Sequence, residues 1–188
     1  MTEGDDESDE ALAARAGRGD RRAFERLVRR HRSALYRFVR RYAGQRDDAY
    51  DILQETFVAA WLSSSRFDPS RPFLPWLRII ALNKCRDFGR RQMVRRLLLR
   101  ATRAEPDTSD LWNSEGDVRS DADRLAQLDR AVAALPAFYK EPLLLTLVSG
   151  LSHQEAAEIL HTTAKAIEMR IYRAKRKLAT DLDDPPEG

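Results

Sequence analysis

The sequence predicts an all-α protein built from two small helical domains that a flexible acidic linker joins. Apolar residues recur at helical spacing in several segments, no segment shows the alternation of a strand, and one acidic stretch without periodicity divides the chain. The expected divisions are a tail with a short leading helix at 1–19, a first domain at 20–96, the linker at 97–121, a second domain at 122–182 and a tail at 183–188.

The first long helix of the first domain has clear end signals. Gly17 to Asp20 interrupts the leading helix, and the Asp20 side chain can cap a helix that starts at the next residue. That helix runs to about Ala43, and Gly44 is expected to end it in the left-handed conformation. His31 falls in register with its apolar stripe, which predicts a core face.

Two more helices complete the predicted first domain. One starts near Asp47 or Asp48, where acids suit the positive end of the helix dipole, and runs to about Ser63. Residues 63–72 contain two prolines and a polar cluster, which predicts a loop. The last helix starts near Phe73 and runs to Arg91 or beyond.

Composition excludes several classes of protein. The 188 residues are 43% hydrophobic and 34% charged, with a net charge of +3. No apolar run is long enough to cross a bilayer and no signal peptide is visible, so we expect no membrane insertion and a cytoplasmic location. Cys85, the single cysteine, is expected in the core, and the three histidines are scattered. We therefore expect no metal, no cofactor and no catalytic site.

The second domain ends in a predicted helix-turn-helix. Ser152 and Glu155 have the spacing of a capping box, in which each residue's side chain bonds the other's backbone N–H. A short helix follows, and residues 161–163 interrupt it with side chains suited to capping the next helix. In that next helix an apolar stripe beginning at Ile167 is expected to pack on the first helix.

The second of these helices is strongly basic. It contains six basic residues and a single acid, Glu168, and this density of positive charge favours binding to a polyanion. Taken alone, the basic run also fits a solvated helix end, because cations interact favourably with the C-terminal dipole. The capped helix and short turn before it favour DNA binding. The bases are Lys165, Arg170, Arg173, Lys175, Arg176 and Lys177.

Three segments carry a resemblance to a known family. They read DDAYDILQETFVAAW at 47–61, FLPWLRIIALNKCRDFGRR at 73–91, and LPAFYKEPLLLTLVSGLSHQEAAEIL at 135–160 followed by RIYRAKRKL. The first two resemble the second conserved region of the extracytoplasmic-function (ECF) sigma factors of bacterial RNA polymerase, and the third resembles their fourth region. The resemblance implies a subunit that binds core polymerase, directs it to promoters and helps to open them.

The resemblance assigns the polymerase-binding face to residues 47–61. In the family this helix docks on the clamp of the largest polymerase subunit. The matching exposed residues are expected to be Asp51, Gln54 and Glu55, whose oxygens can accept bonds from Arg or Lys. Without the rest of the motif, an ordinary solvated face would explain these residues equally well.

The resemblance also implies contacts with the −10 promoter element. There an opened strand offers bases that can stack on aromatic rings. Phe67 and Asn83 match pocket positions, although the first could also fill the core and the second could be an ordinary bonded polar residue. Arginines along the helix would hold phosphates, which position the protein without specifying sequence. These arginines are Arg78, Arg86, Arg90 and Arg91.

The basic helix is expected, by the same resemblance, in the major groove of the −35 element. The expected contacts are Thr163, Lys165, Glu168, Met169, Arg170, Arg173 and Arg176, of which the last two would hold phosphates. His161 stands where the family commonly has a glycine, and Glu168 can accept from cytosine but not bond the acceptors of guanine. The promoter preference is therefore expected to differ.

Further partners and alternatives follow. The family is commonly held inactive by an anti-sigma factor, so we expect one here, and the acidic linker would follow the RNA path of the polymerase or act as a plain tether. One alternative is a stand-alone helix-turn-helix regulator that binds duplex DNA. The other is a helical module that binds RNA or protein through its basic faces.

Overall fold

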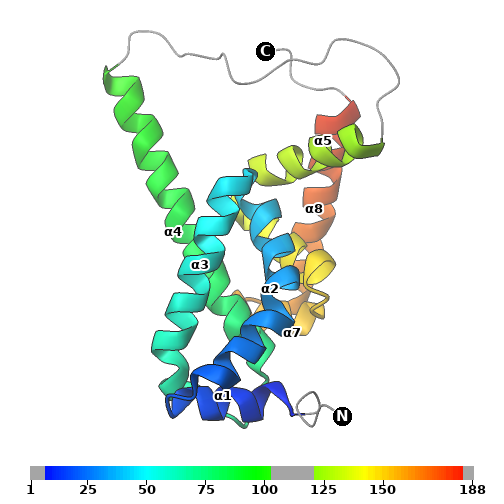
Figure 1. The fold of residues 1–188 in the computed structure, drawn as a ribbon. Helices are drawn as coiled ribbons and strands as arrows, with labels where there is room; N and C mark the ends of the chain where they lie inside the picture. Colours follow the sequence, from blue (N-terminus) through cyan, green and yellow to red (C-terminus); the bar gives the residue numbers. More distant parts are fainter. Residues whose placement is uncertain (1–6, 103–120, 184–188) are drawn as a thin grey trace.

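The computed structural model describes residues 7–102 and 121–183, and it is helical in both stretches (Figure 1). No strand occurs among these residues, which confirms the predicted all-α class. The elements are α1 (Asp9–Gly17), α2 (Arg21–Ala43), α3 (Arg46–Ser63), the 3₁₀ turn η1 (Ser64–Arg66), α4 (Phe73–Thr102), α5 (Asp121–Ala134), α6 (Ala137–Leu143), the π-helical turn η2 (Leu144–Val148), α7 (His153–Ile159) and α8 (Ala164–Asp183).

The predicted signals at the ends of α2 are confirmed. The Asp20 carboxylate accepts from the backbone N–H of Ala23 at 3.1 Å, which satisfies a donor that the helix leaves free. Gly44 has a φ of 82° and donates its N–H to the Arg40 carbonyl at 3.0 Å. A left-handed residue of this kind ends a helix at low cost when it is glycine.

Acidic side chains at the N-terminus fasten α1 to the first domain. Asp9 bonds the buried His31 ring at 2.6 Å and the Arg30 guanidinium at 2.9 Å, so α1 is tied to the middle of α2. Glu10 accepts from the backbone N–H of Phe73 at 3.1 Å and so caps α4. The sequence shows this acidic run, but the partners lie 21 and 22 residues from Asp9 and 63 residues from Glu10, so no local pattern predicts them.

The core of the first domain lies between α2, α3 and α4. Phe38, Ile52 and Leu77 are almost fully buried there, and burying each side chain contributes about 1.5–3 kcal/mol. Cys85 is also fully buried, as predicted, and its surroundings raise the pKa of the thiol because burial disfavours the thiolate.

The helix α4 is longer than its sequence signals suggested. It continues to Thr102, so residues 97–102, expected in the linker, are helical. Neither glycine nor proline occurs between residues 90 and 105, and the residues there are mostly good helix formers. Figure 1 shows this end of α4 projecting away from the other helices. Of the remaining predicted linker residues, 103–120 lie outside the described part of the chain, and Asp121 is the first residue of α5.

The second domain packs α5, α6 and α7 around α8. Pro136 precedes α6, where its fixed φ is compatible with a helix start. Leu144, Leu145 and Ile167 are buried in the middle of this domain. The π-helical turn η2 follows Pro142, whose missing N–H interrupts the ordinary bonding pattern of α6.

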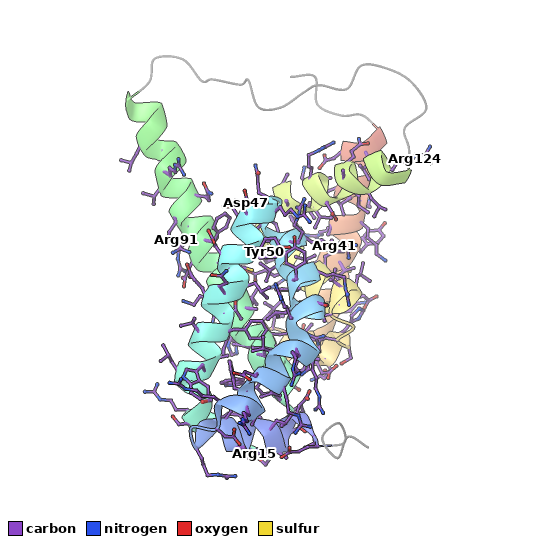
Figure 2. All side chains as sticks on the ribbon, viewed as in Figure 1. Arg15, Arg41, Asp47, Tyr50, Arg91 and Arg124 are labelled. Atoms are coloured by element: carbon purple, nitrogen blue, oxygen red, sulfur yellow. The ribbon has the colours of Figure 1, made fainter. Side chains whose placement is uncertain are left out.

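The two domains lie against one another, with α5 and η2 packed on α2 (Figure 1). Arg41, labelled in Figure 2, forms an ion pair with Asp129 of α5 at 3.2 Å. A Cβ placed on Gly44 would lie 2.7 Å from the Cβ of Ala133, so the end of α2 approaches α5 closely. This contact leaves no room for a side chain at Gly44.

Candidate nucleic-acid and protein interfaces

The helix-turn-helix forms through the capping residues predicted from sequence. The Ser152 hydroxyl accepts from the Glu155 N–H at 3.2 Å, and the Glu155 carboxylate accepts from the Ser152 N–H at 2.8 Å. These bonds lower the pKa of Glu155. Thr163 caps α8 by accepting from the Ala166 N–H at 3.1 Å. Both helices of the motif therefore start where the sequence placed them.

The turn between α7 and α8 contains a strained residue. His161 has a φ of 51°, and it is the one non-glycine residue with a positive φ in the described part of the chain. This left-handed conformation is unfavourable for a residue with a Cβ, which explains why a glycine would suit the position better.

The first turns of α8 present an exposed polar face. Lys165 and Glu168 form an exposed ion pair at 2.8 Å, and the bond from Lys165 lowers the pKa of Glu168. Arg170 lies over the Phe138 ring at 4.0 Å and donates to the Thr162 hydroxyl at 3.4 Å. This stacking limits the motion of Arg170. The other predicted contacts Thr163, Met169, Arg173 and Arg176 are exposed.

The predicted protein-binding residues lie on one face of α3. Asp51 and Gln54 are exposed. Glu55 is half-buried and pairs with two bases of α4, Lys84 at 3.6 Å and Arg91 at 3.3 Å. Figure 2 shows Arg91 beside α3. The face is thus free at two of the three predicted residues and already paired at the third.

Sequence reasoning missed the apolar part of this face. Val58 is 58% exposed and Leu62 is 75% exposed, although both are hydrophobic. They continue the stripe of Asp51 and Glu55 at helical spacing. An exposed apolar residue beside polar ones is typical of a protein-binding surface. The helical spacing from Asp51 was the available signal.

Phe67 belongs to an aromatic cluster. It is 8% exposed, and its ring centroid lies 5.6 Å from that of Phe73 and 5.2 Å from that of Trp76. Edge and tilted contacts of this kind are favourable between aromatic rings. The residue thus anchors the loop between η1 and α4 on the core, which was the alternative role for it, and its contact with a −10 base stays a prediction.

The residues predicted for −10 contacts do not share one open surface. Asn83 is exposed on α4, and Arg90 and Arg91 are exposed further along it. Arg90 pairs with Asp87, one turn before it. Their exposed side chains leave this part of α4 accessible.

Two of the predicted arginines face the second domain instead. Arg78 is 8% exposed and lies near Glu155 of α7, and burial lowers the pKa of its guanidinium. Arg86 donates to Glu141 of α6 at 2.8 and 2.6 Å, which raises the pKa of Arg86. The second domain therefore covers part of the α4 face on which these side chains lie.

Neither a candidate membrane-spanning helix nor a candidate metal-binding cluster occurs among the described residues. No helix in 7–102 or 121–183 has the length and apolar character that a membrane span requires. Within the same residues no group of three or more histidines, cysteines and acids is placed to hold a metal ion.

Comparison with known proteins identifies the family. The family model of sigma-70 region 2 matches residues 27–95, and that of sigma-70 region 4 matches residues 125–178. The RNA polymerase sigma factor NccH of Alcaligenes xylosoxydans xylosoxydans is 42% identical over 176 residues, which are 93% of this chain and 94% of NccH. The chain belongs to the RNA polymerase sigma factors.

Further relatives place this sigma factor in the ECF group. The ECF RNA polymerase sigma factor SigC of Mycobacterium tuberculosis is 31% identical over 182 residues, covering 97% of this chain and 95% of SigC. The predicted family is therefore confirmed. The match to region 2 also favours a sigma factor over a stand-alone helix-turn-helix regulator.

A solved structure agrees with the fold of this sigma factor. The structure of CnrH in complex with the cytosolic domain of CnrY matches with a TM-score of 0.70 at 35% identity, covering 95% of this chain and 99% of CnrH. CnrH is an RNA polymerase sigma factor of Cupriavidus metallidurans and is 38% identical over 188 residues. Both helical regions therefore follow the architecture of a known sigma factor.

Proposed function

We propose that this ECF sigma factor docks on core RNA polymerase through α3 and contacts the promoter through α4 and α8. One observation carries the proposal. A single chain contains both matched regions in order, and each presents an exposed polar face on the helix that the family uses. The sigma factor would aim the polymerase at chosen start sites and leave the chemistry to that enzyme, in the cytoplasm.

The α3 face suits a helical, basic partner. Asp51 and Gln54 offer oxygens that accept from Arg or Lys, and unlike charges speed the approach of two proteins. Val58 and Leu62 add apolar area that leaves water on binding. The expected partner is the clamp of the largest polymerase subunit.

The exposed start of α8 suits the major groove of the −35 element. Glu168 can accept from a cytosine amino group, and Lys165 and Arg170 can donate to guanine acceptors. The exposed pair between Lys165 and Glu168 opens at small cost, because surface ion pairs contribute little. The exposed guanidinium groups of Arg173 and Arg176 would hold phosphates.

The exposed part of α4 suits the −10 element. Asn83 can bond an unpaired base, and Arg90 and Arg91 can hold phosphates beside it. Phe67 contacts a base only if it leaves the aromatic cluster, so in the present arrangement it supports the loop.

Transcription with purified components tests this function. Adding the chain to core polymerase and candidate promoters should produce new, site-specific transcripts. The double variant Asp51→Ala/Glu55→Ala should lose polymerase binding while its circular dichroism stays unchanged. Glu25→Ala, an exposed acid on α2, is the matched control. Normal polymerase binding by the double variant would show that the α3 assignment is wrong.

A second variant tests promoter reading. Lys165→Ala/Arg170→Ala should weaken −35 recognition while leaving polymerase binding intact, because both side chains lie on α8. Arg124→Ala removes an exposed base of α5 and serves as the control (Figure 2). Unchanged promoter selectivity of the double variant would contradict the assignment of α8.

We further propose an inhibitory protein that covers the polymerase-binding face. The complex of CnrH with the cytosolic domain of CnrY supports it, since that sigma factor resembles this chain along its whole length. The tagged chain should recover from its native cell a protein that blocks transcription when added back. Recovery of no inhibitory protein would count against this partner.

A further inference from the structure

Two adjacent charged residues of α6 are buried where the domains meet. Lys140 and Glu141 are each 7% exposed, although charged side chains are seldom buried without partners. Their partners in the first domain are Tyr42 of α2 and Arg86 of α4, so these two charged residues join the domains. We call these four residues the interdomain cluster.

The strongest contact of the cluster joins α4 to α6. Arg86 donates from Nε to Oε1 of Glu141 at 2.8 Å and from Nη2 to Oε2 at 2.6 Å. This two-bond arrangement fixes both the distance and the orientation of the two groups. The Tyr42 hydroxyl lies 3.5 Å from Glu141 Oε1 on the other side.

Lys140 fastens α6 to the end of α2. Its Nζ donates to the Tyr42 carbonyl at 3.3 Å and to the carbonyl of Ala133, and lies 4.7 Å from the centre of the Tyr42 ring. Burying these charges is costly unless every bond is made, so the cluster specifies one arrangement of the domains more than it adds stability.

The interdomain cluster holds Arg86, a side chain that is also expected to bind DNA. The family resemblance of the sequence implies that Arg86 holds a phosphate of the −10 region, yet here both of its bonds go to the Glu141 carboxylate. A carboxylate and a phosphate accept from arginine in the same forked geometry, so they compete for it. Arg78 is covered by the second domain in the same arrangement.

We propose that Glu141 is an internal competitor of promoter phosphate, which holds the two domains closed over α4 until DNA displaces it. The closed form binds −10 DNA poorly because Arg78 and Arg86 face the second domain. Opening breaks the bonds of Arg86 to Glu141. The Glu141 carboxylate then becomes hydrated, and the Arg86 guanidinium binds water or a DNA phosphate. The competition with DNA phosphate rests on the proposed function, whereas the closure of the two domains does not depend on it.

Distances between the domains test closure without polymerase or DNA. Spin labels on Ser33→Cys and Thr180→Cys in a Cys85→Ala background report the separation of α2 and α8, and both labelled positions are exposed. The unmodified interface should give one narrow distance distribution. Glu141→Gln should increase the open-to-closed ratio about tenfold, as expected for losing a bond to a charged group. The control Glu158→Gln, an exposed acid of α7, should leave the distribution narrow.

We call the pair of Arg86 and Glu141 the latch. A charge exchange separates a specific loss of the latch from a general disruption of the interface between the domains. In Arg86→Glu/Glu141→Arg the pair can form in the reverse sense, so the narrow distribution should return. A closed distribution in Glu141→Gln, or an open one in the exchanged pair, would overturn the latch. Complexes of core polymerase with promoter then test the DNA side, because Glu141→Gln should form them faster than the parent chain. An open Glu141→Gln variant with no such gain would overturn the competition alone.

Discussion

At the scale of the residue, His161 is the clearest point where this chain departs from a low-energy backbone. The turn between α7 and α8 requires a positive φ, and the Cβ of histidine is unfavourable there. The imidazole is exposed, and among the described residues it has no hydrogen bond or ion pair that would offset this strain. The caps Ser152 and Thr163 fix where α7 and α8 begin, and this holds the turn in its geometry despite the strain.

Replacing His161 with glycine should stabilise the protein. Glycine removes the strain of about 1 kcal/mol or more but loses more entropy on folding, so we expect a net gain of about 0.5 kcal/mol in the free energy of unfolding. Urea denaturation measures it. His161→Ala keeps the Cβ and should give no gain, and a stabilised alanine variant would assign the effect to the imidazole instead.

Single residues differ in how well the sequence predicts them. The caps Asp20, Ser152 and Thr163 were predictable because each bonds a backbone group three residues away. Arg86 and Glu141 were not predictable as a pair, because their contact depends on how two domains meet. The sequence marked Arg86 as a phosphate contact, and the structure shows that a carboxylate occupies it.

At the scale of the element, periodicity predicted which helices form but not all of their free faces. Helical spacing in α3 puts Ile52 and Leu53 on the face that packs inward, and both are buried. Val58 and Leu62 are exposed on this helix, which a sequence cannot show directly because apolar side chains usually pack inward. The helix α4 continues past Arg91 into residues 97–102 of the predicted linker, which the sequence pattern did not indicate because amphipathicity fades there, although no helix-breaking residue occurs.

Charging the apolar part of the α3 face should weaken polymerase binding. Val58→Glu places a carboxylate where Val58 would lose water on docking, so we expect an affinity at least about tenfold lower. The fold should persist because the side chain is largely exposed. Binding of labelled protein to core polymerase measures this, with Ser33→Glu on α2 as a control of equal charge. Equal affinities of the two variants would place the docking surface elsewhere.

At the scale of the whole molecule, buried charge links domain closure to pH. Burial lowers the pKa of Lys140 to about 8, while the nearby Cys85 and Glu141 act in the opposite direction. In an open form the amine meets water and regains a pKa of about 10.4. The closed form therefore binds this proton more weakly than the open form does. Closing becomes more favourable as the pH rises above about 8, up to the pKa of the open form.

The other groups around Lys140 do not reverse this sign. Burial raises the pKa of Tyr42 and of Cys85, which keeps both neutral in this range, and the bonds to Glu141 raise the pKa of Arg86, which keeps it charged. The spin-label distances should therefore shift toward the closed form between about pH 7 and about pH 9, with the open-to-closed ratio falling by up to about tenfold per unit above the pKa of Lys140. Lys140→Met keeps the length and removes the proton, so its ratio should stay flat. A parent chain whose distances ignore pH, or a methionine variant that responds equally, would show that Lys140 does not set the balance.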